Sequence, residues 1–208
     1  MCGGRDFVPR ETISNSEFLI LNSEFNRLIP HPLLTPNSSL VLLTTFNYML
    51  KLRLICMGRL TSAPFREAAE DYLRRISRFY SLSVTEIKPE PLPLSPSPAD
   101  IGRALDAEAS RILAAIPSRG VLWAMCVEGK TLSSEEFSSK IEAVGTSGAG
   151  ELCFVVGSSH GLAESVKRRA ALRLSVSPMT FPHELFRVML LEQIYRAGEI
   201  AAGGKYHK

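Results

Sequence analysis

Two loops in the last third of the chain combine residue types that suit a small-molecule site. The apolar segment Phe154–Val156 runs into Gly157–Leu162, and a second loop, Ser177–Pro182, precedes a long helical pattern that begins at His183. Glycine lets backbone N–H groups come close to a ligand, and proline braces the second loop. We expect these loops to bind an apolar cofactor with a few polar edges.

The segments that must position these loops alternate between two kinds of pattern. Helical spacing of apolar residues begins near Ser62, Ser97, Ser133, Glu164 and His183. Strand-like segments lie before and between these helices, at residues 51–57, 82–88, 121–127, 152–156 and 172–176. The first of them is apolar at nearly every position, as expected of a strand that is covered on both faces. The alternation predicts an α/β fold with a mostly parallel sheet and helices on both faces.

Parallel sheets bind ligands beyond the carboxyl ends of their strands. Three loops should lie at that edge: the loop after Met125–Val127, the loop after Val156, and Ser177–Pro182. We expect them to converge on one pocket.

The glycine-rich run Gly145–Gly150 precedes a strand and has no Lys-Ser/Thr ending, so we interpret it as a turn and not as a phosphate loop. A nucleotide-dependent oxidoreductase is disfavoured because the G-x-G-x-x-G pattern is absent.

Composition narrows the class of protein. The chain has 208 residues, of which 45% are hydrophobic, which is enough for a full core. No stretch reaches the roughly 18 uncharged apolar residues that a membrane span needs, so we expect no membrane insertion. The four cysteines, Cys2, Cys56, Cys126 and Cys153, lack metal-ligand spacing. We expect reduced, buried thiols of an intracellular protein and no metal site.

Residues 1–48 differ from the rest of the chain. They are rich in Ser, Asn and Pro, with three arginines against four acidic residues and no sustained periodicity, whereas organelle transit peptides are usually poor in acids. We expect a poorly ordered leader or extension at 1–48 and one folded domain at 49–208. Two interpretations stay open: a cytoplasmic protein with an upstream extension, or an organellar protein of the chloroplast or mitochondrion whose leader targets it.

The net charge of the folded part and the pattern of its last helix indicate which kinds of partner to expect. Residues 49–208 carry 21 basic and 17 acidic residues, a net charge of about +4, which is milder than a general nucleic-acid binder usually shows. The helix predicted from His183 to about Ala202 is apolar around most of its girth. Such a helix must be covered on more than one side, so we expect a homodimer across it.

Several motifs together resemble one known family. These are Phe154–Leu162, the run Ser175–Arg187, the segment Leu191–Ala197 and the terminal Tyr206-His207, all within a likeness that covers about residues 49–208. They resemble the SPOUT-class 23S rRNA pseudouridine N3-methyltransferases, the RlmH family. The resemblance implies an α/β (trefoil) knot in which the C-terminal segment threads through a loop, an obligate homodimer, and S-adenosylmethionine as cofactor.

The resemblance also implies roles for individual residues. The cofactor would be held by Met125, Gly157, Ser158, Ser177, Pro178, Met179, Thr180, Phe181 and Pro182. Lys205, Tyr206 and Lys208 would contact RNA, with Tyr206 stacking on a base and the lysines meeting phosphates. The family usually has a second glycine where this chain has Ser158, and a Cβ there would narrow the pocket.

Methyl transfer needs the acceptor nitrogen, the methyl carbon and the leaving sulfur nearly in line, so orientation can supply much of the catalysis. A base or cation that favours a deprotonated imide nitrogen would help. The candidates are His183, Arg187, Glu192 and His207. Each has a plainer alternative: His183 caps a helix, Glu184 and Arg187 form a surface pair, Glu192 pairs with Arg196, and the tail is frayed.

The sequence therefore predicts an S-adenosylmethionine-dependent rRNA methyltransferase that acts on N3 of a pseudouridine in the large subunit. Its partner would be rRNA, recognised within the assembled ribosome as in the family. The alternative is a non-catalytic, ribosome-associated RNA-binding protein of the same fold, which the serine at position 158 suggests.

Overall fold

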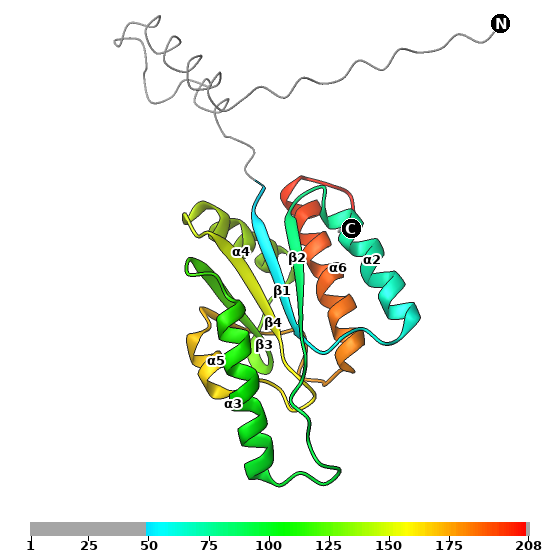
Figure 1. The fold of residues 1–208 in the computed structure, drawn as a ribbon. Coiled ribbons are helices and arrows are strands. Elements are labelled where there is room, and N and C mark those ends of the chain that lie inside the picture. Colours follow the sequence, from blue (N-terminus) through cyan, green and yellow to red (C-terminus); the bar gives the residue numbers. More distant parts are fainter. Residues whose placement is uncertain (1–48, 207–208) are drawn as a thin grey trace, which may run out of the picture. The chain divides into compact units, whose positions relative to one another are not determined.

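A computed structural model of the chain describes residues 49–206 (Figure 1). The predictions for residues 1–48, Cys2 among them, and for His207 and Lys208 lie outside the described residues. The elements follow in the order β1 (Lys51–Met57), α2 (Ala63–Ile76), β2 (Ser81–Ile87), α3 (Pro98–Ala115), β3 (Gly120–Thr131), α4 (Ser134–Thr146), β4 (Glu151–Val156), α5 (Glu164–Arg169), β5 (Leu172–Ser175) and α6 (His183–Ala201).

The five strands form one sheet in the order β2-β1-β4-β3-β5, and every neighbouring pair is parallel. The predicted parallel α/β sheet is confirmed. Because all strands run the same way, their carboxyl ends meet at one edge, which lies at the bottom of Figure 1. The loops after β3, β4 and β5 therefore leave the sheet on the same side.

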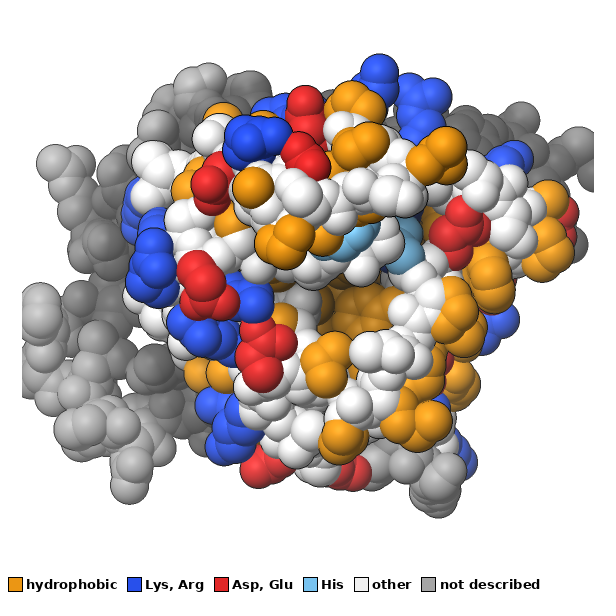
Figure 2. All heavy atoms as spheres, turned by 90° about the horizontal axis from the view of Figure 1, so that it is seen from below, with side chains coloured by type: hydrophobic (Ala, Val, Ile, Leu, Met, Phe, Trp, Pro, Cys, Tyr) orange, Lys and Arg blue, Asp and Glu red, His pale blue; other side chains and the backbone are white. Residues whose placement is uncertain are grey.

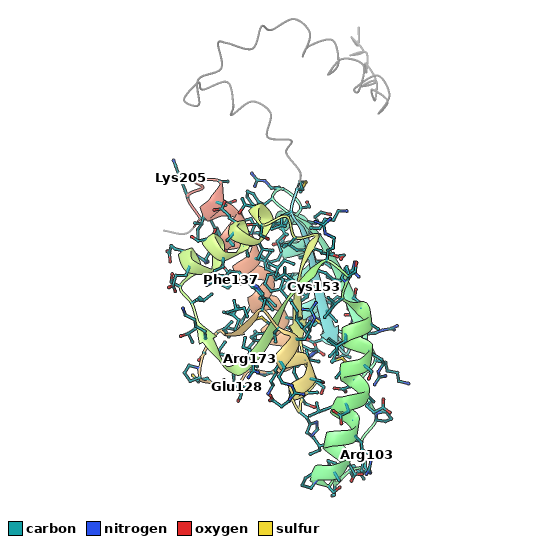
Figure 3. All side chains as sticks on the ribbon, turned by 90° about the vertical axis from the view of Figure 1, so that its left-hand side faces the viewer. Arg103, Glu128, Phe137, Cys153, Arg173 and Lys205 are labelled. Carbon is teal, nitrogen blue, oxygen red and sulfur yellow. The ribbon has the colours of Figure 1, made fainter. Side chains whose placement is uncertain are left out.

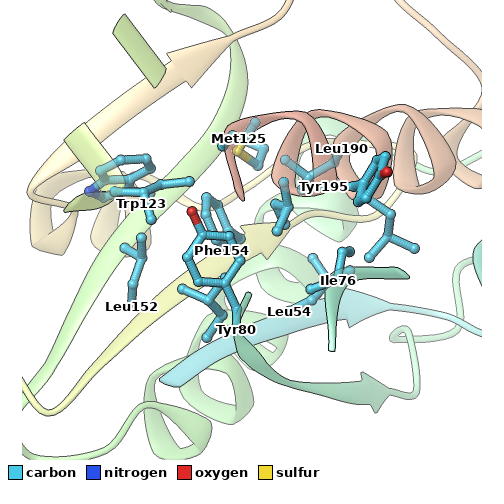
Figure 4. Packing of buried hydrophobic residues seen from close by; sticks show 14 of the residues in the cluster. Leu54, Ile76, Tyr80, Trp123, Met125, Leu152, Phe154, Leu190 and Tyr195 are labelled. Carbon is cyan, nitrogen blue, oxygen red and sulfur yellow. The ribbon is translucent and has the colours of Figure 1, made fainter. Parts of the chain in front are cut away.

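Helices cover both faces of the sheet, and each face has its own core. Leu52, Leu54 and Cys56 of β1 pack with side chains of α2, α4 and α6. The alternate residues Ile55 and Met57 pack with side chains of α3 and α5. This period-two division is what a strand buried on both faces requires. Figure 4 shows the first core, where Phe154 and Leu152 lie near Trp123 and Leu190 comes from α6.

Two of the predicted helix starts carry reciprocal capping boxes. The Ser97 hydroxyl accepts a hydrogen bond from the Asp100 backbone N–H at 3.2 Å, and the Asp100 carboxylate accepts one from the Ser97 N–H at 2.9 Å. Ser133 and Glu136 repeat the arrangement at the start of α4. These caps satisfy N–H groups that a helix terminus leaves without partners, and so fix where α3 and α4 begin.

Strand β3 differs from its prediction. We expected Gly129-Lys130 to close a strand near Val127, but β3 continues to Thr131. Its pairing with β5 shifts between Met125 and Lys130, so the residues in between form a bulge. A Cβ at Gly129 would lie 2.6 Å from the Leu174 carbonyl carbon, so only glycine lets the bulge pass this close to β5.

The thiols are partly as expected. Cys56 and Cys153 are buried and unpaired, but Cys126 is only half-buried because it lies in the β3 bulge. Of the glycine-rich run predicted to be a turn, Gly145 and Thr146 still belong to α4, and the turn itself begins at Ser147, with Gly148 at φ +76°. Among residues 49–206, no helix combines the length and the apolar character that a bilayer crossing needs.

Candidate cofactor pocket

A hollow with a largely apolar floor opens at the carboxyl edge of the sheet, and histidine side chains lie at its rim (Figure 2). Its volume is about 470 Å³, within the range of small-molecule sites. The loops after β4 and β5 line it together with Met125–Glu128, which belong to the β3 bulge. The three segments predicted to converge do meet at one pocket, but the first of them is a bulge within β3 and not a loop after it. Of the predicted cofactor-binding residues, the lining contains Met125, Gly157, Ser158, Ser177, Met179, Thr180, Phe181 and Pro182.

The loop after β4 is a tight turn that depends on Gly157. A Cβ at Gly157 would lie 2.2 Å from the Gly161 carbonyl oxygen and 2.6 Å from its carbon, which are backbone atoms. The Gly161 N–H donates to the Ser158 carbonyl at 2.9 Å, and Gly161 has φ +86°, a left-handed conformation that favours glycine. The turn itself therefore requires a residue without a side chain at position 157, whether or not a ligand is bound.

Ser158 is held by a residue outside the pocket lining. Its hydroxyl donates to the Glu108 carboxylate on α3 at 2.9 Å. Glu108 is only 3% exposed. The Ser158 hydroxyl is therefore engaged by α3 and does not fill the pocket.

The loop after β5 is stabilised by hydrogen bonds from the hydroxyl groups of its own serines. The Ser175 hydroxyl donates to the Ser177 carbonyl at 2.8 Å, and the Ser177 hydroxyl accepts from the Met179 N–H at 3.0 Å. Pro182 takes the position before α6 with φ −52°, which suits a helix start. Met179 is 70% exposed at the rim. Pro178, which was predicted to hold the cofactor, is not among the residues that line the pocket.

The β3 bulge and α5 form another wall, which sequence reasoning missed. Lys167 of α5 pairs with Glu128 of the bulge and with Glu164 at 3.2 Å. The pairing with Glu128 is the largest cause of the raised pKa of Lys167, and the pairing with Lys167 of the lowered pKa of Glu128. The same bulge turns Cys126 toward the pocket. Nothing in the sequence pattern indicates that β3 bulges, so Lys167 could not be placed at the pocket from the sequence.

His183 lines the pocket, and one of its ring nitrogens is buried without a partner. Its Nε2 is buried without a hydrogen-bond partner, while the ring bonds to the Met57 backbone. The bond to Met57 must use Nδ1, so the proton lies there and Nε2 presents a lone pair. Burial is the main cause that lowers the pKa of His183, with the nearby Arg187 charge adding to it. His183 is therefore neutral at pH 7, and its side chain makes no helix-capping hydrogen bond.

Arg187 does not reach this pocket. It is 3% exposed, pairs with Glu86 of β2 at 2.7 Å, and donates to the Gly58 carbonyl at 3.2 Å. The alternative surface pair with Glu184 was also wrong, because the Glu184 carboxylate accepts hydrogen bonds from the Thr61 hydroxyl and N–H and from the N–H at the α2 N-cap. These bonds lower the pKa of Glu184 to about 2. Arg187 thus ties α6 to the sheet beside the pocket.

Glu192 lies along a different groove. Its carboxylate pairs with Arg196 at 2.6 Å, as the plainer interpretation predicted. It lines a cavity of about 440 Å³ beside α6 that shares Leu174, Ser175 and Val176 with the first pocket. The two cavities are therefore neighbours on either side of β5.

The C-terminal tail lies far from the pocket of its own chain. In Figure 3, Lys205 is labelled near the top of the folded domain, and the pocket residue Glu128 is labelled well below it. Helix α6, with 19 residues, separates His183 from the tail by about 28 Å. The Tyr206 ring packs at 4.8 Å from the Tyr195 ring and under the Arg196 guanidinium, also at 4.8 Å. Among the described residues the tail is thus packed on α6, and its roles in RNA contact stay predictions.

Among residues 49–206, no group of three or more His, Cys, Asp or Glu side chains is placed to hold a metal ion. The pocket instead offers an apolar floor, backbone groups of two tight loops and the side chains of two histidines, His160 and His183. This donor set suits an organic cofactor with an aromatic part and a few polar groups.

Known proteins resemble the chain over the residues that build the pocket. The family model described as "Predicted SPOUT methyltransferase" matches residues 50–207. A ribosomal RNA large subunit methyltransferase H from Leuconostoc mesenteroides is 39% identical over 159 residues, which cover 76% of this chain and 100% of that protein. The protein of the same name from Clostridium botulinum strain Alaska E43 is 40% identical with the same coverage. A solved structure of a probable methylase family protein from Haemophilus influenzae Rd KW20 gives a TM-score of 0.44 at 15% identity, covering 77% of this chain and 72% of that one.

Proposed function

The chain belongs to the SPOUT methyltransferase family, and from that premise we propose that it is an S-adenosylmethionine-dependent methyltransferase of large-subunit ribosomal RNA. The observation that carries the proposal is the convergence of the loops Gly157–Leu162 and Ser177–Pro182 on one pocket. The names of the relatives support rRNA as the substrate class. Methylation at N3 of a pseudouridine follows from the resemblance in the motifs, as does the threading of the C-terminal segment into a knot.

The residues present fit the cofactor. Met125, Leu174 and Phe186 give the pocket apolar surface for an adenine ring and a thioether, and the two loops offer backbone groups for polar edges. When bound, S-adenosylmethionine supplies an electrophilic methyl group on a sulfonium. The chain's own task is then to orient two reactants in line and to exclude water.

His183 is the pocket's clearest acid–base candidate. Its proton is held at Nδ1 by a backbone hydrogen bond to Met57, and Nε2 is buried with its lone pair unused, so a rotation of the ring would let Nε2 accept a hydrogen bond or a proton from a group in the pocket. An imide nitrogen must lose its proton before or during methyl transfer, and a neutral imidazole can receive it. Burial lowers the pKa of His183 and keeps the ring neutral, and the nearby Arg187 guanidinium adds to this effect.

We propose a homodimer in which the partner's tail completes each pocket. The tail's own pocket is a full helix away, and the cavity beside α6 leaves an apolar surface around Val188 and Met189 open to a second copy. A partner placed there could bring its Lys205, Tyr206, His207 and Lys208 over the pocket. In that arrangement Glu192 would lie at the dimer groove, and its catalytic role would require the partner. Whether residues 1–48 act as an organellar leader stays a prediction.

Calorimetry with S-adenosylmethionine and S-adenosylhomocysteine tests the pocket, and methyl incorporation into ribosomal particles tests the activity. We expect micromolar binding and transfer to large-subunit rRNA. Absence of binding at millimolar cofactor would contradict the proposal. Binding without methyl transfer to any ribosomal particle would favour the non-catalytic RNA-binding alternative, which no contact of Ser158 supports, since its hydroxyl is engaged by Glu108.

A further inference from the structure

A buried carboxylate on α3 lies behind the pocket and forms no ion pair with any residue of the described range 49–206. Glu108 is 3% exposed, and each of its two oxygens accepts one hydrogen bond. One comes from the Glu90 backbone N–H at 2.9 Å, and the other from the Ser158 hydroxyl at 2.9 Å. Burying a carboxylate is costly unless its oxygens are satisfied. With only two neutral donors, Glu108 depends on both of them.

The carboxylate joins two segments that are distant in the sequence. Glu90 lies in the proline-rich segment after β2, and its side chain pairs with Arg111 on α3 at 2.6 Å. Ser158 lies in the loop after β4, 50 residues beyond Glu108. A chain of polar contacts therefore runs from Arg111 through Glu90 and Glu108 to the pocket loop. Because α3 packs on the sheet through Ala109 and Ile112, this chain is anchored on a rigid element.

The same contact restrains the pocket loop. Ser158 is the second residue of the turn, and its carbonyl accepts the Gly161 N–H that closes the turn. A hydroxyl fixed by a buried carboxylate holds the Ser158 backbone in place and thereby holds the turn closed. A glycine at position 158 has no side chain to make this bond. It would also leave one oxygen of Glu108 buried without a partner, which costs more than the bond itself contributes.

We propose that Glu108 is a positioning residue for the cofactor loop and that Ser158 is its partner. The two form a buried brace particular to a chain with serine at this position. The inference rests on the proposed function for its link to S-adenosylmethionine, but the brace itself is a property of the free protein. Restoring the family's usual glycine should therefore weaken cofactor binding in this chain.

The test compares variants of the full chain by calorimetry with S-adenosylhomocysteine. Ser158→Gly and Ser158→Ala should each raise Kd about tenfold, the effect of one hydrogen bond to a charged group. Glu108→Met should do the same, and Glu108→Gln should bind nearly as wild type, because its amide can still serve both partners. The double variant Ser158→Ala/Glu108→Met should be no weaker than either single one, since both act through one contact.

Ser110→Ala is the matched control, because this exposed hydroxyl on α3 bonds only to the Asp106 carbonyl of its own helix. It should leave Kd unchanged. Hydrogen exchange in the cofactor-free protein gives a second readout that does not depend on binding. The Gly161 amide should exchange about tenfold faster in Ser158→Ala and Glu108→Met than in the wild type and Glu108→Gln.

The outcomes separate the two proposals. If the wild type binds no cofactor but the Gly161 amide responds as expected, the proposed function fails and the brace stands. If the wild type binds and Ser158→Gly binds equally well or better, with Gly161 exchange unchanged, the brace is refuted. Additive effects in the double variant would likewise overturn it, because independent residues do not form one contact.

Discussion

Gly157→Ala tests how the pocket loop is built. The added Cβ would lie 2.2 Å from the Gly161 carbonyl oxygen, whereas carbon and oxygen atoms in contact are about 3.3 Å apart. The turn must therefore open by about 1 Å. Overpacking of this kind costs about 1–3 kcal/mol. If the closed turn is what the cofactor binds, that cost appears in affinity, and Kd should rise between about fivefold and about a hundredfold.

The assay is calorimetry with S-adenosylhomocysteine, with thermal unfolding measured on the same samples. The control is Gly102→Ala on α3, where a Cβ meets nothing within 4 Å. It should leave Kd unchanged and stabilise the fold by about 0.5–1 kcal/mol, the helix propensity difference between alanine and glycine. Wild-type affinity for Gly157→Ala in a folded protein would refute the view that the closed turn forms the cofactor wall.

Three further predictions concern groups around the pocket. Glu86→Gln should lower the free energy of unfolding by about 2 kcal/mol in urea titrations, because the buried Arg187 guanidinium loses its counter-charge while water reaches part of the site. His183 has a lowered pKa, so below its ordinary value of 6.5 the unfolded chain binds more protons there. Stability should therefore fall as the pH drops below 6.5, and less so in His183→Gln. Burial raises the pKa of Cys56 to about 12, so a thiol reagent at pH 8 should modify Cys126 far faster, and bound S-adenosylhomocysteine should protect Cys126.

Each of these has its own control and its own contrary result. The exposed Glu67→Gln on α2 should be neutral, and an equal loss in both variants would show that the Glu86 pair adds no stability of its own. If the free energy of unfolding falls with pH in the same way for the wild type and for His183→Gln, His183 is not the group whose titration destabilises the fold. Peptide mapping locates the modified thiols, and labelling of Cys126 that ignores bound cofactor would place it outside the binding site.

The alternation of patterns was enough to predict the layers of the fold. An apolar run such as Lys51–Met57 allows only a strand with two buried faces, and Ser133 with Glu136 specifies a helix start through local hydrogen bonds. The position of the loops Gly157–Leu162 and Ser177–Pro182 at one edge then follows from parallel strand direction. These features were predictable because each depends on residues that are neighbours in the sequence.

The contacts that shape the pocket could not be predicted in this way. The bulge that carries Glu128 to Lys167 arises only from the pairing of β3 with β5, and the partners of Arg187 and Ser158 lie on β2 and α3. Sequence placed Arg187 among the acid–base candidates, but the tertiary structure made it a buried tie between α6 and the sheet. Sequence thus determined the elements and the edge at which a cofactor would bind. Only the packing of distant segments decided which side chains face that cofactor, because such partners are chosen by proximity in space.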